Sequence, residues 1–489
     1  MHSRVGYTLL LIAALVATHP IAAQAAPHPT RLPAAVQAAL SRQHLPTSSL
    51  HAWVMSSDGK SPILSWRSDQ AANPASVMKL VTTYAALSRL GPSFTWKTTI
   101  KAYGQLSGDT LHGSVWVRGG GDPKLVVERL EPMLQSLREA GIRRIAGDVV
   151  LDHRAFTLGP TDPAEFDGEP LRPYNSTPDA LLINFKALVM TFTPDAAAGV
   201  ARVKVDPPMA GIHMDPLVTL STGPCGDWRG QLRATVADPA QLRFFGSYPL
   251  ACGEREWPTA YADPTSHAAR AIAGMWQKLG GELSGSARDW QAQDKPLETL
   301  SPVFARSFDS LPLSDIVRDV NKFSNNVMAQ HLMLTLGLQF QPALAGSDTR
   351  AAGRQALLDW WRATFPDLKA PVLDNGSGLS RHERIRADSL GRMLLHALRS
   401  PVTRELTESL PVSGQDKALA RRADLPTGQA WLKTGTLRDV SALAGYVRGA
   451  DEALYAVVAI INHPNAATGR PALDALVNWV ARQQARQAQ

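Results

Sequence analysis

The chain has 489 residues, 44% of them hydrophobic and 19% charged, which is the composition of a folded globular protein and excludes an intrinsically disordered one. This length predicts several domains, or one large domain with insertions. The formal net charge of +7 is modest and no basic run is interleaved with aromatic residues, which argues against nucleic acid as a partner.

The N-terminal segment, residues 1–25, has the pattern of a secretory signal peptide. Arg4 supplies a positive charge, residues 9–17 are apolar, and Ala23-Gln24-Ala25 fits a cleavage site. The apolar stretch is too short to span a bilayer, which takes about 20 residues. No cysteine near the cleavage site could carry a lipid. We therefore expect a soluble mature chain that begins near Ala26 and lies in the periplasm, without stable membrane insertion. Its net charge of +6 suits solubility, and attraction to an anionic polymer is the alternative.

The first mature elements are a helix, a hairpin and a second helix. Residues 32–42 have a helical pattern, and the runs HAWVM and PILSW, divided by SSDGKS, indicate a β-hairpin. From Val77 the apolar residues recur at i, i+3, i+4 and i+7, which predicts a helix. Gly91-Pro92 ends it.

The sequence pattern changes from helical to strand-like after residue 96. Short alternating segments divided by Gly and Asp indicate that residues 97–299 are β-rich. Helical patterns return near Leu311, three strand-like runs follow (QAWLKTGT, SALAGYV and LYAVVAII), and a last helix begins at Pro471. We predict an α+β fold in which residues 26–96 and 300–489 form one discontinuous domain, with an antiparallel sheet covered by helices and with residues 97–299 inserted.

The β-rich block contains both cysteines of the chain, Cys225 and Cys252. In an exported protein an even count predicts one disulfide, and the neighbouring glycine and proline residues suit a loop-closing bridge. Two unpaired thiols are the alternative. No histidine pair flanks them at the spacing of a zinc site, so we expect no metal there.

The stretch NPASVMKL places Ser76 and Lys79 one helical turn apart at the start of the second helix. Both side chains then share one face, where Lys79 could take the proton of the hydroxyl if its pKa is lowered. The ordinary alternative is a capping serine beside a solvated lysine. Ser57 and Lys60 have the same spacing, but they lie in a polar turn with no helix after it, so we interpret them as a loop.

Two further motifs follow in the C-terminal part. Ser324-Asn325-Asn326 offers a hydroxyl and an amide near a helix boundary, although polar residues at a helix start are a plain alternative. Lys433-Thr434-Gly435-Thr436 ends a predicted strand, where glycine lets a ligand approach the backbone and where the lysine and the hydroxyls suit a carboxylate. A strand-ending turn is the alternative.

In this order the three motifs form the set found in the penicilloyl-serine transferases. The long gap between the first and second motifs, and the stretches VRGGGDPKL, RPYNSTPDALLINF and LDNGSGLSR, resemble the class C low-molecular-mass penicillin-binding proteins, which are D-alanyl-D-alanine carboxypeptidases and endopeptidases. The resemblance runs over nearly the whole mature chain. One departure is Asn325, where aspartate is more frequent.

The resemblance implies a serine DD-peptidase that acts on peptidoglycan stem peptides, with neither a cofactor nor a metal. Ser76 would attack the carbonyl of a D-Ala–D-Ala bond or of a D-Ala–diaminopimelate cross-link, with Lys79 as the general base. Ser324 would relay a proton to the leaving amine, and Asn326 would position Lys79 and the peptide. β-Lactams would acylate Ser76.

The third motif would bind the substrate carboxylate. Lys433 would add positive potential and help to keep Lys79 neutral, while Thr434 and Thr436 would hydrogen-bond the carboxylate beside Gly435. The resemblance also implies an oxyanion hole formed by the backbone N–H groups of Ser76 and Thr436.

Two other functions are open to the same motifs. A serine β-lactamase would hydrolyse the penicilloyl ester quickly, but the long insertion and the lack of an evident deacylating glutamate motif argue against it. A non-catalytic peptidoglycan-binding scaffold would not need three intact motifs. Other stretches are less specific. Gly119–Gly121 lacks the residues of a phosphate loop, residues 374–378 do not match G-x-S-x-G, and His382 and His463 have no partners at a useful spacing.

Overall fold

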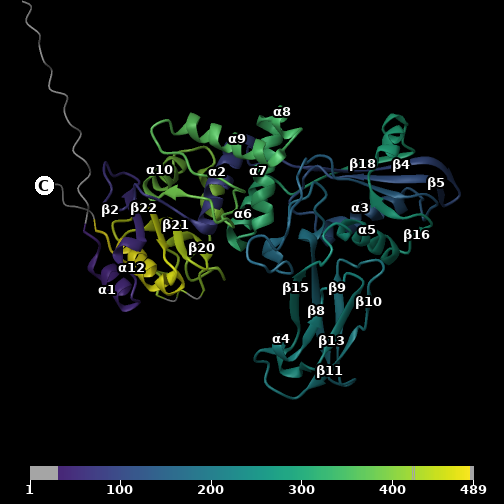
Figure 1. Ribbon diagram of the computed structural model, residues 1–489, viewed down its shortest axis with the longest axis horizontal. Helices are drawn as coiled ribbons and strands as arrows, with labels where there is room; N and C mark the ends of the chain where they lie inside the picture. Colours follow the sequence, from purple (N-terminus) through teal and green to yellow (C-terminus); the bar gives the residue numbers. More distant parts are fainter. Residues whose placement is uncertain (1–30, 421, 423, 485–489) are drawn as a thin grey trace, which may run out of the picture.

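The computed structural model describes residues 31–420, 422 and 424–484. The expected signal peptide, residues 1–25, lies outside these described residues. Figure 1 shows three lobes: a lobe of helices and a sheet built from both ends of the chain, a second sheet beside it, and a narrower β lobe that projects from the junction.

The first lobe is built on a five-stranded antiparallel sheet in the order β2-β1-β22-β21-β20. The predicted hairpin and the three predicted C-terminal strands are all in it, so these expectations are confirmed. Strand β1 pairs with β22, which joins the two ends of the chain in one sheet. The strands are β1 (Leu50–Ser56), β2 (Leu64–Trp66), β20 (Ala430–Leu437), β21 (Val440–Arg448) and β22 (Leu454–Asn462).

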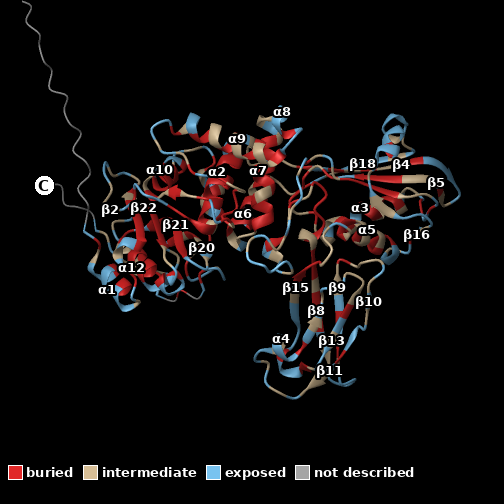
Figure 2. Ribbon diagram, viewed as in Figure 1, coloured by how far each residue is buried: buried red, intermediate tan, exposed pale blue. Residues whose placement is uncertain are grey.

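Both faces of this sheet are buried by helices, because its central strands are apolar on both sides. Alternate residues point to opposite faces, and each face belongs to a separate hydrophobic cluster. Figure 2 shows this lobe with a buried interior on both sides of the sheet. One face carries α1 (Ala34–Arg42) and α12 (Arg470–Ala481). The other carries α2 (Lys79–Leu90), α6 (Leu313–Phe323), α7 (Asn326–Phe340), α9 (Thr349–Thr364), α10 (Ala387–Ala397) and α11 (Thr403–Ser409).

The expected C-terminal helix packs on the sheet, as predicted. Leu473, Leu476, Val477 and Val480 of α12 are buried in the same cluster as α1. Within the part of the chain that the structure describes, no helix combines the length and apolarity needed to cross a bilayer.

The region between residues 97 and 309 forms the other two lobes. A seven-stranded mixed sheet contains β4 (Lys97–Ser107), β5 (Thr110–Arg118), β6 (Arg144–Ile145), β7 (Val149–Asp152), β16 (Glu282–Leu283), β17 (Ala287–Asp289) and β18 (Phe304–Asp309). Two helices that the sequence analysis did not expect pack on this sheet, α3 (Val127–Glu139) and α5 (His267–Lys278). Strand β18 lies beyond residue 299 and pairs with β4, so we propose that the insertion ends near residue 309.

The projecting lobe is almost entirely β. Its own small core packs around Phe192 and Tyr248, and Cys225 and Cys252 form a disulfide there, as predicted. Its strands are β8 (Ala187–Asp195), β9 (Val200–Asp206), β10 (His213–Met214), β11 (Leu217–Ser221), β12 (Arg233–Thr235), β13 (Gln241–Phe245), β14 (Tyr248–Pro249) and β15 (Arg255–Ala260), with the short helix α4 (Trp228–Gln231).

Candidate active site

Ser76 lies in a tight turn that leads directly into α2. The turn, η2 (Ala75–Met78), is a 3₁₀ helix, and its first residue, Ala75, has a φ of 47°. Residues with a β-carbon rarely adopt this left-handed conformation, which costs free energy unless the surroundings hold it. The side chain of Asn73 supplies one such contact, because its Oδ1 accepts a hydrogen bond of 2.9 Å from the Ala75 N–H. The turn therefore presents Ser76 in a fixed position.

Lys79 is buried and is in contact with three oxygen atoms. Its Nζ lies 3.0 Å from Ser76 Oγ, 2.6 Å from Asn326 Oδ1 and 2.5 Å from the Ser377 carbonyl oxygen. An ammonium group has three N–H donors and can satisfy all three. A neutral amine has two donors and one lone pair, so in that state it can donate to the amide and the carbonyl and accept the proton of the Ser76 hydroxyl.

The electrostatic surroundings of Lys79 favour its neutral form. Burial lowers its pKa well below the usual value, and the charge of Lys433 lowers it further. The buried carboxylate of Glu383 acts in the opposite direction and raises it. Burial also lowers the pKa of Lys433, to about 7.

The second and third sequence motifs meet at Ser324 and Lys433. The Nζ of Lys433 donates hydrogen bonds to Ser324 Oγ, 2.8 Å away, and to the Thr434 carbonyl oxygen, 3.0 Å away. Ser324 separates α6 from α7 and has a left-handed φ of 57°. Asn325 then caps α7 through its Oδ1, which accepts from the Met328 N–H.

Two glycines allow other segments to lie against the turn that carries Ser76. A β-carbon on Gly435 would lie 2.6 Å from the Pro74 carbonyl oxygen, and one on Gly378 would lie 1.9 Å from the Ala75 carbonyl oxygen. Both distances are too short for any side chain. The glycine of the Lys-Thr-Gly motif therefore lets β20 approach the turn closely, in addition to any approach by a ligand.

The two threonines of the third motif lie on β20 at the edge of the sheet. Thr434 is half-buried and Thr436 is exposed, and β20 is the last strand in the sheet order. Their contact with a substrate carboxylate stays a prediction.

The insertion contributes directly to this site. The Nδ2 of Asn326 donates a 2.9 Å hydrogen bond to the Tyr174 carbonyl oxygen, which turns the Oδ1 of the same amide toward Lys79. Further along α7, the buried His331 joins two loops of the insertion. Its Nδ1 lies 2.9 Å from the Gly121 carbonyl oxygen, and its Nε2 accepts from the Asp179 N–H. Gly119–Gly121 thus belong to a structural loop.

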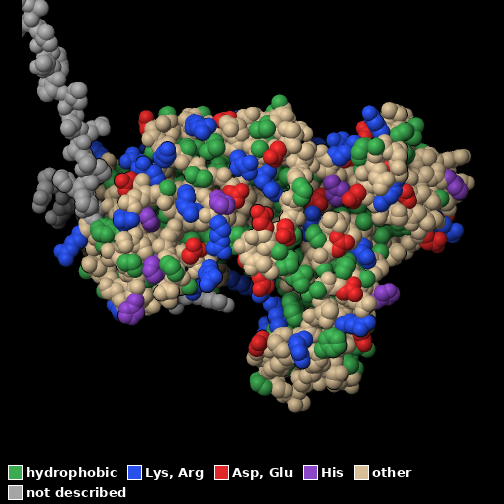
Figure 3. All heavy atoms as spheres, in the orientation of Figure 1, with side chains coloured by type: hydrophobic (Ala, Val, Ile, Leu, Met, Phe, Trp, Pro, Cys, Tyr) green, Lys and Arg blue, Asp and Glu red, His purple; other side chains and the backbone are tan. Residues whose placement is uncertain are grey.

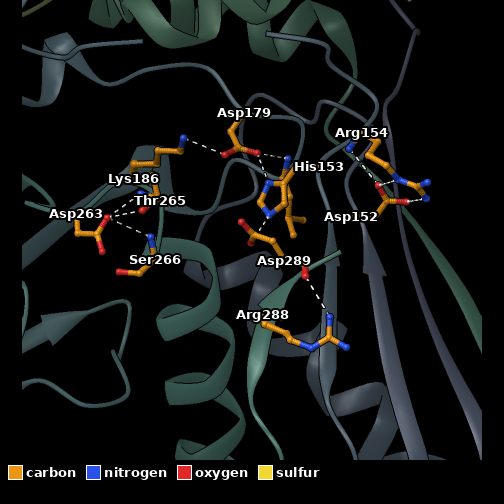
Figure 4. Close-up of polar contacts among 11 residues, drawn as sticks. Asp152, His153, Arg154, Asp179, Lys186, Asp263, Thr265, Ser266, Arg288 and Asp289 are labelled. Atoms are coloured by element: carbon orange, nitrogen blue, oxygen red, sulfur yellow. Dashed lines mark hydrogen bonds and ion pairs between the residues drawn. The ribbon is translucent and has the colours of Figure 1, made fainter. Parts of the chain in front are cut away.

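Asp179 is itself held by a cluster of polar side chains, most of which are half-buried. Figure 4 shows its carboxylate between Lys186 and His153, with Asp289 beyond the His153 ring. Burial alone would raise the pKa of Asp179, but His153 and Lys186 hold it below its usual range. Burial alone would lower the pKa of His153, but the two carboxylates raise it to about 9. The cluster therefore fixes the loop that carries Tyr174.

A cavity of about 220 Å³ lies beside the site, between residues 161–178 of the insertion and residues 374–382 of the first lobe. Its lining includes the carboxylates Asp162 and Glu165 and the guanidinium groups Arg350 and Arg381. On the face shown in Figure 3, acidic side chains gather in the middle of the molecule with basic side chains beside them. The cavity can therefore take a ligand group that carries both signs of charge.

Sequence reasoning did not find Glu383, which is fully buried near Lys79. Its two oxygen atoms accept hydrogen bonds from four backbone N–H groups, those of Asp374, Asn375, Gly376 and Gly378. Glu383 follows the stretch LDNGSGLSR, but nothing in the sequence indicates that it turns inward. Sequence reasoning also missed Tyr174, because its contact is a backbone carbonyl.

The remaining sequence candidates lie elsewhere. Ser57 and Lys60 are in the turn after β1, where Lys60 is exposed. His382 is exposed, and His463 accepts a hydrogen bond from the Asn465 N–H. Among the residues that the structure describes, no three His, Cys, Asp or Glu side chains gather as metal ligands would.

Comparison with known proteins identifies the family. The model of the D-Ala-D-Ala carboxypeptidase 3 (S13) family matches residues 32–483. A D-alanyl-D-alanine carboxypeptidase from Actinomadura sp. (strain R39) is 28% identical over 400 residues, which cover 77% of this chain and 71% of the relative.

Two solved structures show the same fold. Penicillin-binding protein 4 from Haemophilus influenzae has a TM-score of 0.69 and 22% identity, with 92% of this chain and 99% of that chain covered. A penicillin G-acylated predatory endopeptidase from Bdellovibrio bacteriovorus, in complex with an immunity protein, has a TM-score of 0.52 and 15% identity, with 90% of this chain and 95% of that chain covered.

Proposed function

The chain belongs to the D-Ala-D-Ala carboxypeptidase 3 (S13) family, and we therefore propose that it cleaves D-alanyl peptide bonds of peptidoglycan through an acyl-enzyme on Ser76. It is a low-molecular-mass penicillin-binding protein and a serine-type carboxypeptidase. The observation that carries the assignment of the nucleophile is the buried Lys79, whose Nζ lies 3.0 Å from Ser76 Oγ.

Lys79 acts as the general base in the acylation step. Neutral Lys79 takes the proton of the Ser76 hydroxyl while Oγ forms a bond to the substrate carbonyl carbon. The resulting ammonium group donates its three N–H bonds to Asn326, to Ser377 and to the ester oxygen of Ser76. The lowered pKa of Lys79 supports this role, because a lysine of ordinary pKa would be protonated at neutral pH.

Ser324 and Lys433 assist the departure of the amine. When the C–N bond of the substrate breaks, the proton that Lys79 took from Ser76 passes through Ser324 to the leaving nitrogen, and Lys79 is neutral again. The hydrogen bond between Lys433 and Ser324 Oγ supports this role. The oxyanion is bound by the backbone N–H groups of Ser76 and Thr436, and Thr434 and Thr436 bind the substrate carboxylate. Water then hydrolyses the ester and regenerates Ser76.

The natural substrates include cross-links as well as C-terminal D-Ala–D-Ala. The cavity between the insertion and residues 374–382 supports the cross-link substrate, because diaminopimelate carries an ammonium and a carboxylate that suit its mixed lining. The solved endopeptidase of the same fold provides a precedent. The disulfide supports the periplasm as the location, since disulfides persist in oxidising compartments.

Substitution of the nucleophile tests the first proposal. Ser76→Ala should abolish covalent labelling by a fluorescent penicillin, because among the described residues Ser76 carries the hydroxyl that contacts Lys79 Nζ. Ser57→Ala is the matched control, since Ser57 has the same spacing to a lysine in the sequence. Labelling lost in a folded Ser57→Ala variant, or retained in Ser76→Ala, would show that the nucleophile is assigned wrongly.

Cross-link cleavage needs its own measurement. The wild-type protein should release monomers from cross-linked muropeptides and D-alanine from pentapeptide monomers, both read by mass spectrometry. Release of D-alanine alone would restrict the enzyme to carboxypeptidase activity. Rapid turnover of nitrocefin would instead identify a β-lactamase.

A further inference from the structure

We propose that Glu383 is a positioning residue of the catalytic site, which fixes the carbonyl group that faces Lys79 and supplies the buried negative charge that stabilises Lys79 when it accepts a proton. This inference rests on the proposed role of Lys79 as the base.

The geometric part of the argument concerns the loop of residues 374–378. Oε1 of Glu383 accepts from the N–H groups of Asp374, Asn375 and Gly376 at 3.2, 3.1 and 2.7 Å, and Oε2 accepts from Gly378 at 2.9 Å. Ser377 lies between these anchor points. One carboxylate therefore organises the loop that presents the Ser377 carbonyl oxygen to Lys79 Nζ at 2.5 Å.

The same loop packs against the turn that carries Ser76. The Gly376 carbonyl oxygen accepts from Thr82 Oγ1 at 2.6 Å, and the space for a side chain on Gly378 is filled by the Ala75 carbonyl group. A shift of the loop would therefore disturb both Lys79 and the turn that carries Ser76.

The pattern of donors indicates that Glu383 is ionised. All four of its hydrogen bonds in the described structure are donated to it, so both oxygen atoms act as acceptors. A protonated carboxyl group would need an acceptor for its own O–H, and a carboxylate does not. Burial raises the pKa of Glu383 above its usual value and the charge of Asp374 acts in the same direction, while the backbone donors offset only part of this increase.

Two buried charges act on Lys79 with opposite signs. Lys433 repels the ammonium form, and Glu383 stabilises it. This combination suits a base that must be neutral before the reaction and must hold a proton during it. Burial and Lys433 together favour the neutral base before the reaction, whereas Glu383 favours the proton once Lys79 has accepted it.

The test is the pH dependence of acylation in Glu383→Gln. Glutamine has nearly the same size, and its Oε1 can still accept from the loop, but the charge is gone. The pKa of Lys79 should fall, so the acid limb of the second-order rate constant for penicillin acylation should move to lower pH, by roughly one unit. The plateau rate should fall about tenfold, because the base is weaker.

A matched control is Asp474→Asn, which removes another buried carboxylate on the opposite face of the sheet, where it pairs with Arg422. This variant should keep the acid limb at the wild-type pH. A Glu383→Gln variant whose acid limb also stays in place, whatever its rate, would show that Glu383 is only structural.

If the Glu383→Gln variant does not fold, the Glu383→Asp variant is measured in its place. The charge is kept but the reach to the loop is shortened, so the plateau should fall while the acid limb stays near the wild-type pH. A limb that moves in this variant would overturn the proposal. Absence of labelling in the wild-type protein would instead contradict the proposed function itself.

Discussion

At the level of single residues, Lys79 and Lys433 are two lysines that have different roles in one buried site. Both are almost fully buried, yet they contact different oxygen atoms: Lys79 reaches Ser76, Asn326 and Ser377, and Lys433 reaches Ser324. A pKa near 7 means that Lys433 is charged below neutral pH and increasingly neutral above it. The repulsion between the two lysines is therefore itself dependent on pH.

Lys433→Ala should weaken acylation in two ways. Loss of the positive charge raises the pKa of Lys79, so the acid limb should move to higher pH, opposite to the direction expected for Glu383→Gln. Loss of the contact with Ser324 should lower the plateau on the order of 100-fold. The measurement is the second-order rate of acylation by a penicillin as a function of pH.

Lys433→Arg serves as the charge-retaining control. Its guanidinium differs in shape and hydration, so it should recover only part of the rate. If a folded Lys433→Ala protein is acylated at the wild-type rate, Lys433 has no catalytic role.

At the level of elements, the break between α6 and α7 explains the one departure from the usual second motif. Asn325 is the N-cap of α7, and its Oδ1 accepts from the Met328 N–H at 3.0 Å. Asparagine and aspartate cap helices about equally well. The position therefore tolerates either residue, since its task is to end one helix and begin the next between Ser324 and Asn326.

Asn325→Asp should accordingly change the free energy of unfolding by only a few tenths of a kcal/mol, and Asn325→Ala should lower it by about 1 kcal/mol. Urea denaturation measures both. Asp348→Ala is a matched control, because Asp348 caps α9 through the Ala351 N–H. It should cost a similar free energy without slowing acylation, whereas Asn325→Ala should do both. Equal acylation rates in the two alanine variants would show that the helix cap at Asn325 does not affect catalysis.

The sequence was informative wherever a pattern was local. The three C-terminal strands, the helix after Ser76 and the three motifs could all be predicted, because each depends on spacing within a few residues. The helices α3 and α5 were missed, although Leu130, Met133, Leu134 and Leu137 of α3 have helical spacing. Both helices lie between strands, and the alternating pattern of the neighbouring segments led us to predict that the whole region is β-rich.

Contacts between distant segments could not be predicted in this way. Glu383 is an ordinary charged residue in the sequence, and only the folded chain places it beside Lys79. The carbonyl group of Tyr174 carries no residue-specific signal at all, yet it orients the amide of Asn326. The first placement depends on how distant parts of the first lobe pack, and the Tyr174 contact depends on how the insertion docks, so no local sequence pattern predicts either one.

At the level of the whole molecule, the insertion is hydrogen-bonded to helix α7 through His331. The ring is fully buried, and both of its nitrogen atoms are engaged by backbone groups of the insertion. Nδ1 donates to the Gly121 carbonyl oxygen when Nε2 accepts from the Asp179 N–H, so the neutral imidazole fits both contacts. A protonated ring would lose the second.

The stability of the protein should therefore fall in mild acid. Burial lowers the pKa of His331 to about 4, below the 6.5 of an exposed histidine, so the unfolded chain binds a proton first as the pH falls. Between pH 6.5 and pH 5 this should cost about 2 kcal/mol. His153, with a raised pKa of about 9, does not offset the loss, because its contribution is already complete below pH 6.5.

His331→Gln tests this expectation. Glutamine keeps a donor and an acceptor but does not titrate, so the free energy of unfolding should fall less steeply between pH 7 and pH 5. His382→Gln, at an exposed histidine, should leave the wild-type slope unchanged. An unchanged slope in His331→Gln would mean that His331 does not control the acid response.

The pairing of β1 with β22 also sets the moment at which activity can appear during synthesis. Leu50 pairs with Ile461, so ~400 residues must be added before the sheet can close. At ~5–20 residues per second this takes about 20 to 80 s. For most of that interval the chain already contains Ser76 and Lys79, but Glu383, Lys433 and β20 are added only late in it, and β22 is added after them. A nascent or prematurely terminated chain is therefore inert toward its substrates, and the enzyme becomes competent only when its last strands have been made.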